Sequence, residues 1–344
     1  MKGGTSVPPA RPGVLERSGP FVCGAPMIRR QAVRTRLRAI GVLVVALLAV
    51  TGAFPAPTWA EQAKSRAAVE RLIKDSGADI AVAFRTLDAP GGSPPRLELL
   101  IQPDVEFHAA STMKVPVMIE LFRQARAGLA RLDEPLQVRN EFASIVDGSS
   151  YALSVGDDSD ADVYKRIGQT MTLLELCEPM IVVSSNFAAN LLIQRLGAPS
   201  VQQTVRDLGA DGMIVRRGVE DSKAFAQGLN NATTARALMI LMERIARLDA
   251  VDAEASRSMI EILKRQHFND GIPADLPPGT PVAHKTGSIT KIHHDAAIVL
   301  APRPFILVVL VRGIEDLKQS AALMARIARV LYDEAQAPDA ASAR

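Results

Sequence analysis

The chain has 344 residues, of which 48% are hydrophobic and 22% are charged, proportions typical of a folded globular protein. They exclude wholesale disorder and a protein with many membrane spans, and two cysteines exclude a disulfide scaffold or a four-cysteine zinc site. The net charge of +3 comes from the first 60 residues, which carry eight basic side chains and one acidic one; the remaining 32 basic and 36 acidic groups give no basic surface for a nucleic acid.

Residues 27–60 have the order of an export signal. Met27–Arg38 is basic, Ala39–Phe54 is an uncharged apolar run, and Thr58–Ala60 is a small-residue cleavage site. We therefore predict cleavage after Ala60 and a periplasmic or secreted location. The alternative is an uncleaved N-terminal anchor, for which the apolar run is short. One interpretation of residues 1–26, which precede the basic segment, is that translation starts at Met27 and not at Met1.

Hydrophobic periodicity and turn residues predict the elements of the remaining chain in order. A helix is expected at 61–76, followed by strands at 80–87 and 97–101 around a turn rich in proline and glycine at 90–95. A helical middle follows, with helices at 115–127, 173–181, 187–196, 201–208, 233–248 and 253–265 and a polar loop or insertion at 144–168. The last expected elements are strands at 282–288, 296–301 and 305–311 and a helix at 315–332.

This order predicts an α+β fold in which both ends of the chain build one lobe. Residues 61–110 and 250–344 would form a three-layer α/β/α sandwich with an antiparallel sheet. Residues 111–249 would form an all-helical lobe inserted into it. The two lobes together make up one domain, residues 61–344, after the signal of residues 1–60.

Ser111-Thr-Met-Lys114 is the first motif that carries chemistry. A serine and a lysine three apart at the start of a helix lie on one face. A serine hydroxyl becomes a good nucleophile when a base removes its proton, and burial or nearby positive charge lowers the pKa of a lysine enough for that task. Alone the pattern is weak, because ordinary amphipathic helices carry the same pair on their surface.

Two further motifs carry polar groups suited to the same reaction. Ser184-Ser-Asn186 lies between two predicted helices and offers a hydroxyl and an amide; the alternative is a helix cap. His284-Lys-Thr-Gly-Ser288 lies on a predicted strand, where a lysine beside a threonine hydroxyl suits a carboxylate and the glycine allows close approach to the strand edge. The alternative there is an edge strand with a protective lysine.

Together the three motifs resemble the Ser-x-x-Lys, Ser-Asp-Asn and Lys-Thr-Gly set of the penicillin-recognising serine hydrolases, and specifically the class A β-lactamases. The resemblance covers most of residues 61–335 and implies the β-lactamase/transpeptidase-like fold. It also points to Glu220, in a non-helical stretch between Gly218 and Gly228, as the glutamate that activates water for deacylation. The alternative is a solvated loop carboxylate.

The resemblance implies a role for each of these residues. Lys114, with or without help from Glu220 through water, takes the proton of Ser111, which attacks the lactam carbonyl. The backbone N–H groups of Ser111 and Ser288 form the oxyanion hole, and Ser184 passes the proton to the lactam nitrogen. Lys285 helps to hold the substrate carboxylate. The implied catalytic residues are Ser111, Lys114, Ser184, Glu220 and Lys285, and the implied substrate-binding residues are Asn186, Thr286, Gly287 and Ser288.

No metal or organic cofactor is implied. We expect a monomer that acts on a small-molecule β-lactam, binds no nucleic acid and has no stable membrane association unless the signal stays uncleaved. His293-His-Asp295 does not predict zinc, because adjacent histidines on a strand face opposite sides. Asp158, Asp160 and Asp162 alternate like a calcium loop, but Val163 stands where such a loop needs glycine, so we predict a solvated acidic loop.

Three departures from the family pattern leave the function open. Ser185 replaces the usual aspartate of the second motif, and the segment at 144–168 lengthens the distance from the first motif. The family usually has an asparagine four residues after the glutamate; here that residue is Ala224, with Asn230 and Asn231 as nearby substitutes. The hypotheses are a β-lactamase, a peptidoglycan peptidase or related hydrolase of an acyl-D-Ala type bond, and a non-catalytic penicillin-binding sensor module.

Overall fold

The computed structural model describes residues 59–87 and 96–338, so the predicted export signal and the predicted turn at 90–95 lie outside the described residues. The central feature is a five-stranded sheet in which every neighbouring pair of strands is antiparallel and the order is β2-β1-β11-β10-β9. The strands are β1 (Asp79–Thr86), β2 (Glu98–Ile101), β9 (Val282–Ile289), β10 (Ile292–Val299) and β11 (Phe305–Arg312). All five were expected, and β1 pairs with β11 from the opposite end of the sequence.

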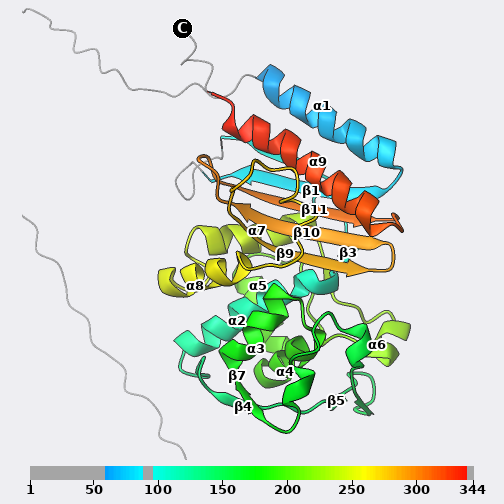
Figure 1. The fold of residues 1–344 in the computed structure, drawn as a ribbon, viewed down its shortest axis with the longest axis vertical. Helices are drawn as coiled ribbons and strands as arrows, with labels where there is room; N and C mark the ends of the chain where they lie inside the picture. The colour runs from blue at the N-terminus through cyan, green and yellow to red at the C-terminus, as the bar shows by residue number, and fades with distance from the viewer. Residues whose placement is uncertain (1–58, 88–95, 339–344) are drawn as a thin grey trace, which may run out of the picture. The chain divides into compact units, whose positions relative to one another are not determined.

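Helices cover both faces of this sheet. α1 (Trp59–Ser76) and α9 (Leu317–Gln336) pack against each other, and α9 packs on β10 and β11 (Figure 1). α7 (Ala235–Ala246) packs on β1, β10 and β11 from the other side, where α8 (Ala253–Leu263) contacts β9. Because helices lie on both sides, the strands are apolar on both faces, as the uninterrupted buried run of β11 shows. The α+β class with three layers is confirmed.

The position of α7 differs from the predicted division into lobes. We assigned residues 111–249 to a separate helical lobe, but α7 belongs to the sheet layer. Leu238, Leu241, Met242 and Ile245 recur at helical spacing and are fully buried. Helical periodicity identifies such a buried face without telling which partner covers it.

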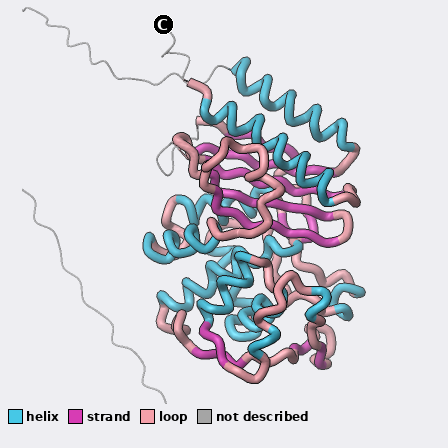
Figure 2. Tube along the Cα trace, viewed as in Figure 1, coloured by secondary structure: helices cyan, strands magenta, loops and turns pink. Residues whose placement is uncertain are grey.

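The remaining long helices form a second group. α2 (Lys114–Arg126) is buried along most of its length among α3 (Leu173–Val182), α4 (Asn186–Leu196) and α5 (Ala198–Asp207) (Figure 2). α3 begins with a capping box, in which Thr172 Oγ1 accepts the Glu175 N–H and the Glu175 carboxylate accepts the Thr172 N–H. One continuous apolar core joins these helices to the α7 side of the sheet, so the second motif is held on a packed scaffold.

The described chain also contains short strands and helical turns, which hydrophobic periodicity does not predict. The strand pairs are β3 (Phe107–His108) with β8 (Ala232–Thr233), β4 (Pro135–Gln137) with β7 (Thr170–Thr172), and β5 (Phe142–Ala143) with β6 (Ser150–Tyr151). The helical turns are η1 (Ala110–Met113), η2 (Val155–Asp157), η3 (Tyr164–Arg166) and the five-residue α6 (Ser222–Ala226). Runs of two to five residues are too short to show a period.

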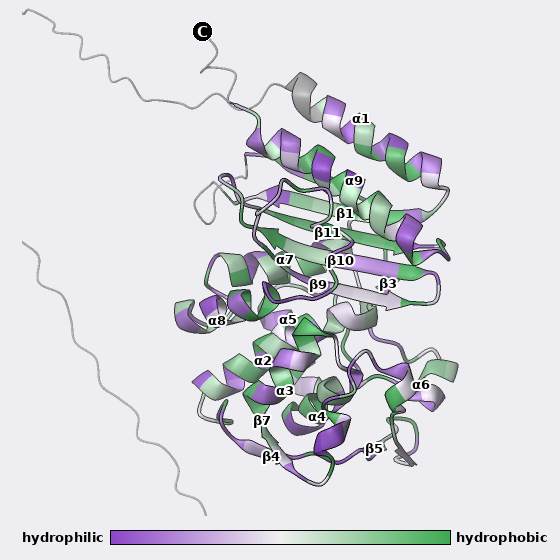
Figure 3. Cartoon of the chain, viewed as in Figure 1, coloured by the Kyte–Doolittle hydropathy of each residue, from purple (hydrophilic) through white to green (hydrophobic). Residues whose placement is uncertain are grey.

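Hydropathy follows the layers, since the inner strands are mostly green and α1 and α9 alternate between green and purple in Figure 3. In the part of the chain that the structure describes, every helix is too short or too polar to cross a bilayer.

Cys177 is fully buried in α3, and burial raises the pKa of its thiol to about 12, as expected of an inert core thiol.

Candidate active site

The strained turn before α2 presents Ser111. Ala110 has a left-handed φ of 45°, which starts η1 immediately after β3. The Ala110 N–H donates to His108 Nδ1 at 3.0 Å, and Thr112 Oγ1 donates to the Ala109 carbonyl at 2.6 Å. We expected serine and lysine one turn apart on one helix; instead the serine lies in the 3₁₀ turn and Lys114 begins α2. The two side chains still meet.

Lys114 lies at the centre of the site. Its Nζ is 3.1 Å from Ser111 Oγ, 3.2 Å from Ser184 Oγ, 2.6 Å from the Ser184 carbonyl oxygen and 2.8 Å from Asn186 Oδ1. Burial lowers the pKa of the Lys114 ammonium to about 7, against the opposing charges of Asp158 and Glu220. A neutral amine has two N–H donors and one lone pair. The Ser184 carbonyl oxygen and Asn186 Oδ1 can only accept, so in the neutral amine they would match the two N–H donors and leave the lone pair available to a hydroxyl.

The second motif is placed by the junction of α3 and α4. Ser184 has a left-handed φ of 60°, which turns the chain between the two helices. Ser185 is buried and its Oγ accepts the Ala188 N–H, so this residue caps α4. A helix cap was the alternative interpretation of this motif. The structure shows that one residue, Ser185, caps the helix, while Ser184 and Asn186 face Lys114.

The three aspartates at 158, 160 and 162 do not form the solvated acidic loop that we expected. Asp158 accepts the backbone N–H groups of Asn186 and Phe187 at 2.9 and 2.8 Å, and Asp160 is buried. Only Asp162 of the three is largely exposed, where it pairs with Lys165. An alternating acidic pattern does not reveal that a helix N-terminus elsewhere in the chain needs an acceptor.

The third motif runs along η1 on the edge strand β9. Lys285 is fully buried, and its Nζ donates to Ser184 Oγ at 2.9 Å and to the Thr286 carbonyl at 2.8 Å. Burial and the charge of Lys114 hold the pKa of Lys285 well below its usual value, with Asp295 acting in the opposite direction. A Cβ on Gly287 would lie 2.9 Å from Ser111 N, closer than real Cβ contacts allow. Glycine is therefore what allows this strand to reach the serine.

Glu220 lines the same cavity as Ser111. It has a left-handed φ of 61°, and its Oε1 accepts from Asn186 Nδ2 at 3.3 Å. Partial burial and repulsion from Asp157 raise the pKa of Glu220, while Lys114 and Arg217 act in the opposite direction. Asn186 thus bridges Lys114 and Glu220.

The asparagines near Glu220 make hydrogen bonds to neighbouring arginines. Ala224 is buried in α6. Asn231 Oδ1 accepts the Arg216 N–H at 2.8 Å, and Asn230 Oδ1 accepts from the Arg217 guanidinium at 3.2 Å. Both asparagines that we considered as substitutes for the family's asparagine are therefore engaged with the two arginines instead.

Two cavities meet at Ser111. One of about 540 Å³ extends past Glu220 and Arg217, and one of about 290 Å³ extends past Ser184 and Thr286. Ser111, Asn186, Ser288 and Asp157 line both. The site is therefore a cleft with the serine at its middle, and all nine residues that the sequence singled out lie at or beside it.

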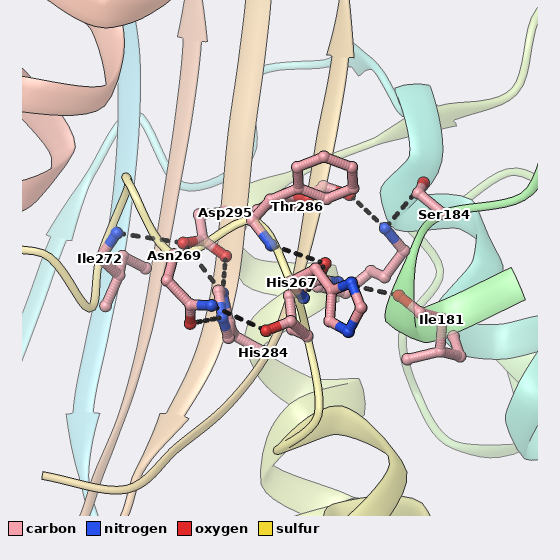
Figure 4. Close-up of polar contacts among 11 residues, drawn as sticks. Ile181, Ser184, His267, Asn269, Ile272, His284, Thr286 and Asp295 are labelled. Atoms are coloured by element: carbon pink, nitrogen blue, oxygen red, sulfur yellow. Dashed lines mark hydrogen bonds and ion pairs between the residues drawn. The ribbon is translucent and has the colours of Figure 1, made fainter. Parts of the chain in front are cut away.

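A polar network that the sequence did not reveal lies behind the third motif (Figure 4). His284 Nδ1 is 3.0 Å from Asp295 Oδ1, and its Nε2 is 3.2 Å from Asn269 Oδ1. Asn269 Nδ2 donates to the Gln266 carbonyl, and Gln266 Nε2 donates to the Ile181 carbonyl near the end of α3. The network joins β9 to the helix that leads into the second motif. Asn269 and Gln266 stand in no recognisable motif, so only the folded chain identifies them.

The described residues contain no cluster of three or more histidine, cysteine or acidic side chains placed to hold a metal ion. The site chemistry shown here is that of hydroxyls, amines, an amide and a carboxylate. A lysine with a lowered pKa next to a serine, with a second hydroxyl beside it, fits nucleophilic acyl transfer.

Comparisons with known proteins agree with this geometry. The model of a family described as the β-lactamase enzyme family matches residues 64–335. The β-lactamase of Bacillus licheniformis is 30% identical over 174 residues, covering 48% of this chain and 57% of the relative. The β-lactamase of Rhodobacter capsulatus is 32% identical over 199 residues, covering 57% and 64%. The chain therefore spans less than two thirds of the length of these curated relatives.

A solved structure supports the fold. The crystal structure of the β-lactamase from Sphaerobacter thermophilus aligns with a TM-score of 0.65 at 22% identity, covering 81% of this chain and 97% of that one. At this identity the likeness concerns the arrangement of the helices and the sheet.

Proposed function

Because the chain belongs to the β-lactamase enzyme family, we propose that it is a serine hydrolase that opens β-lactam rings through an acyl-enzyme on Ser111. The observation that carries this proposal is the position of Lys114 Nζ, 3.1 Å from Ser111 Oγ and 3.2 Å from Ser184 Oγ. One amine thus reaches both the nucleophile and a hydroxyl suited to protonate a leaving nitrogen.

Acylation begins at Ser111. Neutral Lys114 takes the hydroxyl proton as Oγ attacks the lactam carbonyl, and the backbone N–H groups of Ser111 and Ser288 receive the developing oxyanion. The close passage of Gly287 by Ser111 N supports this placement of the two donors. Losing one oxyanion donor typically costs about 2.7–4 kcal/mol of transition-state stabilisation.

The ring opens when the carbon–nitrogen bond breaks. The proton moves from Lys114 to Ser184 Oγ and from there to the lactam nitrogen, so the nitrogen leaves as a neutral amine. Lys285 Nζ, 2.9 Å from Ser184 Oγ, orients this hydroxyl. Lys285 also supports Thr286, which with Gly287 and Ser288 holds the substrate carboxylate, and Asn186 holds the side-chain amide.

Deacylation uses Glu220. Its carboxylate takes a proton from a water molecule as that water attacks the acyl carbon, and the proton returns to Ser111 Oγ as the ester bond breaks. The contact of Asn186 with both Lys114 and Glu220 supports a site in which both halves of the cycle share one amide. This is the class A-like form of the reaction.

A timed measurement of intact mass tests the proposal. Penicillin G is added to the full chain and to Glu220→Gln, and the mass is followed alongside nitrocefin hydrolysis. We expect a transient adduct on Ser111 in the wild type and a persistent one in the variant. A wild-type chain that forms no adduct overturns the nucleophile. An adduct that never leaves, with no difference between the two proteins, indicates the sensor module.

A second candidate, a peptidase of acyl-D-Ala type bonds, is favoured by one observation. Ala224 is buried where the family usually has an asparagine, and Asn230 and Asn231 are bound to the neighbouring arginines. A peptidase predicts slow release of penicillin, in contrast to the rapid release expected of a β-lactamase, so the lifetime of the wild-type adduct decides between them.

We further propose that residues 1–60 export the protein to the periplasm or the medium, with cleavage after Ala60. The basic and apolar order of residues 27–60 supports this. N-terminal sequencing of the protein from a periplasmic extract is expected to begin at Glu61; a cytoplasmic chain that keeps its leader contradicts the proposal.

A further inference from the structure

The residue after Glu220 is a buried acid that the proposed reaction does not use. Asp221 is only 2% exposed. Its Oδ1 accepts from Ser144 Oγ at 2.9 Å and from the Ala224 N–H at 3.1 Å, and its Oδ2 accepts the Ile145 N–H at 3.0 Å. The carboxylate of Asp221 therefore caps α6 and, at the same time, binds the loop that joins β5 to β6.

These donors keep the carboxylate of Asp221 charged. Burial acts to raise its pKa, but hydrogen bonds from Ala224, Ile145 and Ser144, together with the charge of Arg217, hold the pKa below its usual value. Hydrogen bonds to an ionised acceptor are about twice as strong as those between neutral groups. Asp221 thus forms a strong link between two segments that lie 76 residues apart in the chain.

The same hairpin, residues 142–151, also contacts the residue before Glu220. Tyr151 Oη, on β6, donates to the Val219 carbonyl at 3.2 Å. Asn190 of α4 donates to the same carbonyl at 3.0 Å and accepts the Val219 N–H at 2.6 Å. A Cβ on Gly218 would lie 2.3 Å from Asn190 Oδ1, so the chain passes α4 without room for a side chain. The backbone before Glu220 is therefore fixed by α4 and by the hairpin.

Contacts on both sides account for the strained backbone of Glu220. Its φ of 61° is left-handed, which is uncommon for a residue with a side chain. Such a conformation persists only where the surrounding structure over-determines it. If the carboxylate of Asp221 is removed, the chain after Glu220 can relax to an ordinary conformation, and the glutamate side chain moves with it.

We propose that Asp221 is a positioning residue for deacylation, which fixes the Glu220 carboxylate in the cleft by joining its segment to hairpin 142–151. This rests on the proposed function, because Asp221 acts through Glu220. It also gives a role to part of the segment that lengthens the distance between the first two motifs. Ser111 and Lys114 lie on η1 and α2, so the link is expected to govern release of the acyl group and not its formation.

A single turnover with the full chain in excess over penicillin G measures both rates. The adduct is quenched at successive times and followed by intact mass, so that its rise gives acylation and its decay gives release. We expect Asp221→Ala to slow release about ten- to hundred-fold, because misplacing a catalytic group by about 1 Å has an effect of this size. The rate of formation is expected to stay close to that of wild type.

A conservative variant and a matched control accompany Asp221→Ala. Asp221→Asn keeps one acceptor oxygen but presents its amide N–H groups to the Ile145 N–H, so an intermediate release rate is expected. The control is Lys223→Met, which removes exposed contacts between α6 and the same hairpin, to Asp147 and Ser149. Exposed ion pairs contribute little, so this variant is expected to change neither rate.

Hydrogen–deuterium exchange gives a readout that does not require catalysis. Peptides from residues 142–151 and 214–226 are expected to exchange faster in Asp221→Ala, while peptides from α2 and β9 exchange as in wild type. Unchanged exchange in the hairpin, or an equal increase throughout the chain, overturns the link. If Asp221→Ala yields no soluble protein, Asp221→Asn is measured in the same way.

The outcomes separate this inference from the proposed function. Release from both Asp221 variants at the wild-type rate overturns the positioning role and leaves the proposed function intact. A wild-type chain that forms no adduct, or whose release rate is unchanged by Glu220→Gln, overturns the proposed function and this inference with it. The decay of the adduct is a property of each acylated molecule, so a smaller folded fraction does not change it.

Discussion

The carboxylate of Asp158 accepts the backbone N–H of Asn186 at 2.9 Å, at the first turn of α4. Its second oxygen accepts the Phe187 N–H. The second motif has Ser185 where the family usually has an aspartate, and the segment at 144–168 brings a carboxylate to the same helix terminus. Two departures that look unrelated in the sequence thus meet in space.

Two substitutions of Asp158 distinguish its hydrogen bonds to the N-terminus of α4 from the effect of its negative charge. Asp158→Asn keeps an acceptor at the helix terminus but removes a charge that raises the pKa of Lys114. The acidic limb of the acylation rate is therefore expected to move to lower pH, and some stability is lost as well, because asparagine offers one acceptor oxygen where Asp158 uses two. Asp158→Ala also loses the cap and is expected to cost about 1 kcal/mol of unfolding free energy in urea titration. Asp162→Asn, at an exposed acid, is the control; an unshifted profile in Asp158→Asn argues against the electrostatic role.

The pH dependence of acylation reports on Lys114. Burial lowers the pKa of Lys114 to about 7, and the neutral amine is the proposed base. Acylation by penicillin G is therefore expected to rise as the pH rises through about 7 and to level off above it. Lys114→Met is expected to reduce the rate about 10²–10⁴-fold, measured by intact mass. A rate in the wild type that is flat between pH 5 and pH 9 contradicts this assignment.

Gly287→Ala tests the close approach of β9 to η1. The added Cβ would meet backbone nitrogens of Ser111 and Thr112 at 2.9 and 3.0 Å, so the strand or the turn must move. We expect a loss of about 1–3 kcal/mol in unfolding free energy together with slower acylation. Gly156→Ala is the matched control, because its nearest neighbour is a side-chain atom at 3.6 Å. Equal stability and activity in the two variants is the result that this geometry does not allow.

The proposed role of Glu220 in deacylation predicts a dependence on pH. The raised pKa of Glu220 means that the carboxylate form is lost at a higher pH than for an ordinary glutamate, so release of the acyl group is expected to slow as the pH falls through that value. Glu220→Gln is expected to slow release about 10²–10⁴-fold at every pH while leaving acylation within a few-fold of wild type.

A gain of deacylation is tested at residue 224, four residues after Glu220. Ala224→Asn restores the amide that the family usually has, and we expect it to shorten the lifetime of the penicillin adduct without changing its rate of formation. The adduct lifetime is followed by intact mass on both proteins. A longer lifetime in Ala224→Asn shows that a buried side chain at this position disturbs α6 more than it helps Glu220.

The sequence predicts the long elements well, because β11 and α2 carry apolar runs whose length and period are unambiguous. It also predicts which short motifs come together, since the resemblance joins residues 111, 184 and 285. It does not predict that α7 covers the sheet, because a buried helix face looks the same whichever layer packs on it. Nor does it predict the cap by Asp158, which depends on a contact 28 residues away.

Within the site, the sequence shows which side chains are polar, but it does not show which group each of them contacts. His293 and His294 are adjacent and identical in type, yet one is held by hydrogen bonds to the fold and the other lines a cavity beside Ser111. Strand alternation predicts that they face opposite ways. Which side carries the cavity is set by loops that show no periodicity.

The pairing of β1 with β11 joins residues 79–86 to residues 305–312. The first long strand therefore has no neighbour on that side until nearly the whole polypeptide has left the ribosome. A nascent chain with this topology cannot complete its central sheet during most of its synthesis, and it does so only after the β10–β11 hairpin has emerged.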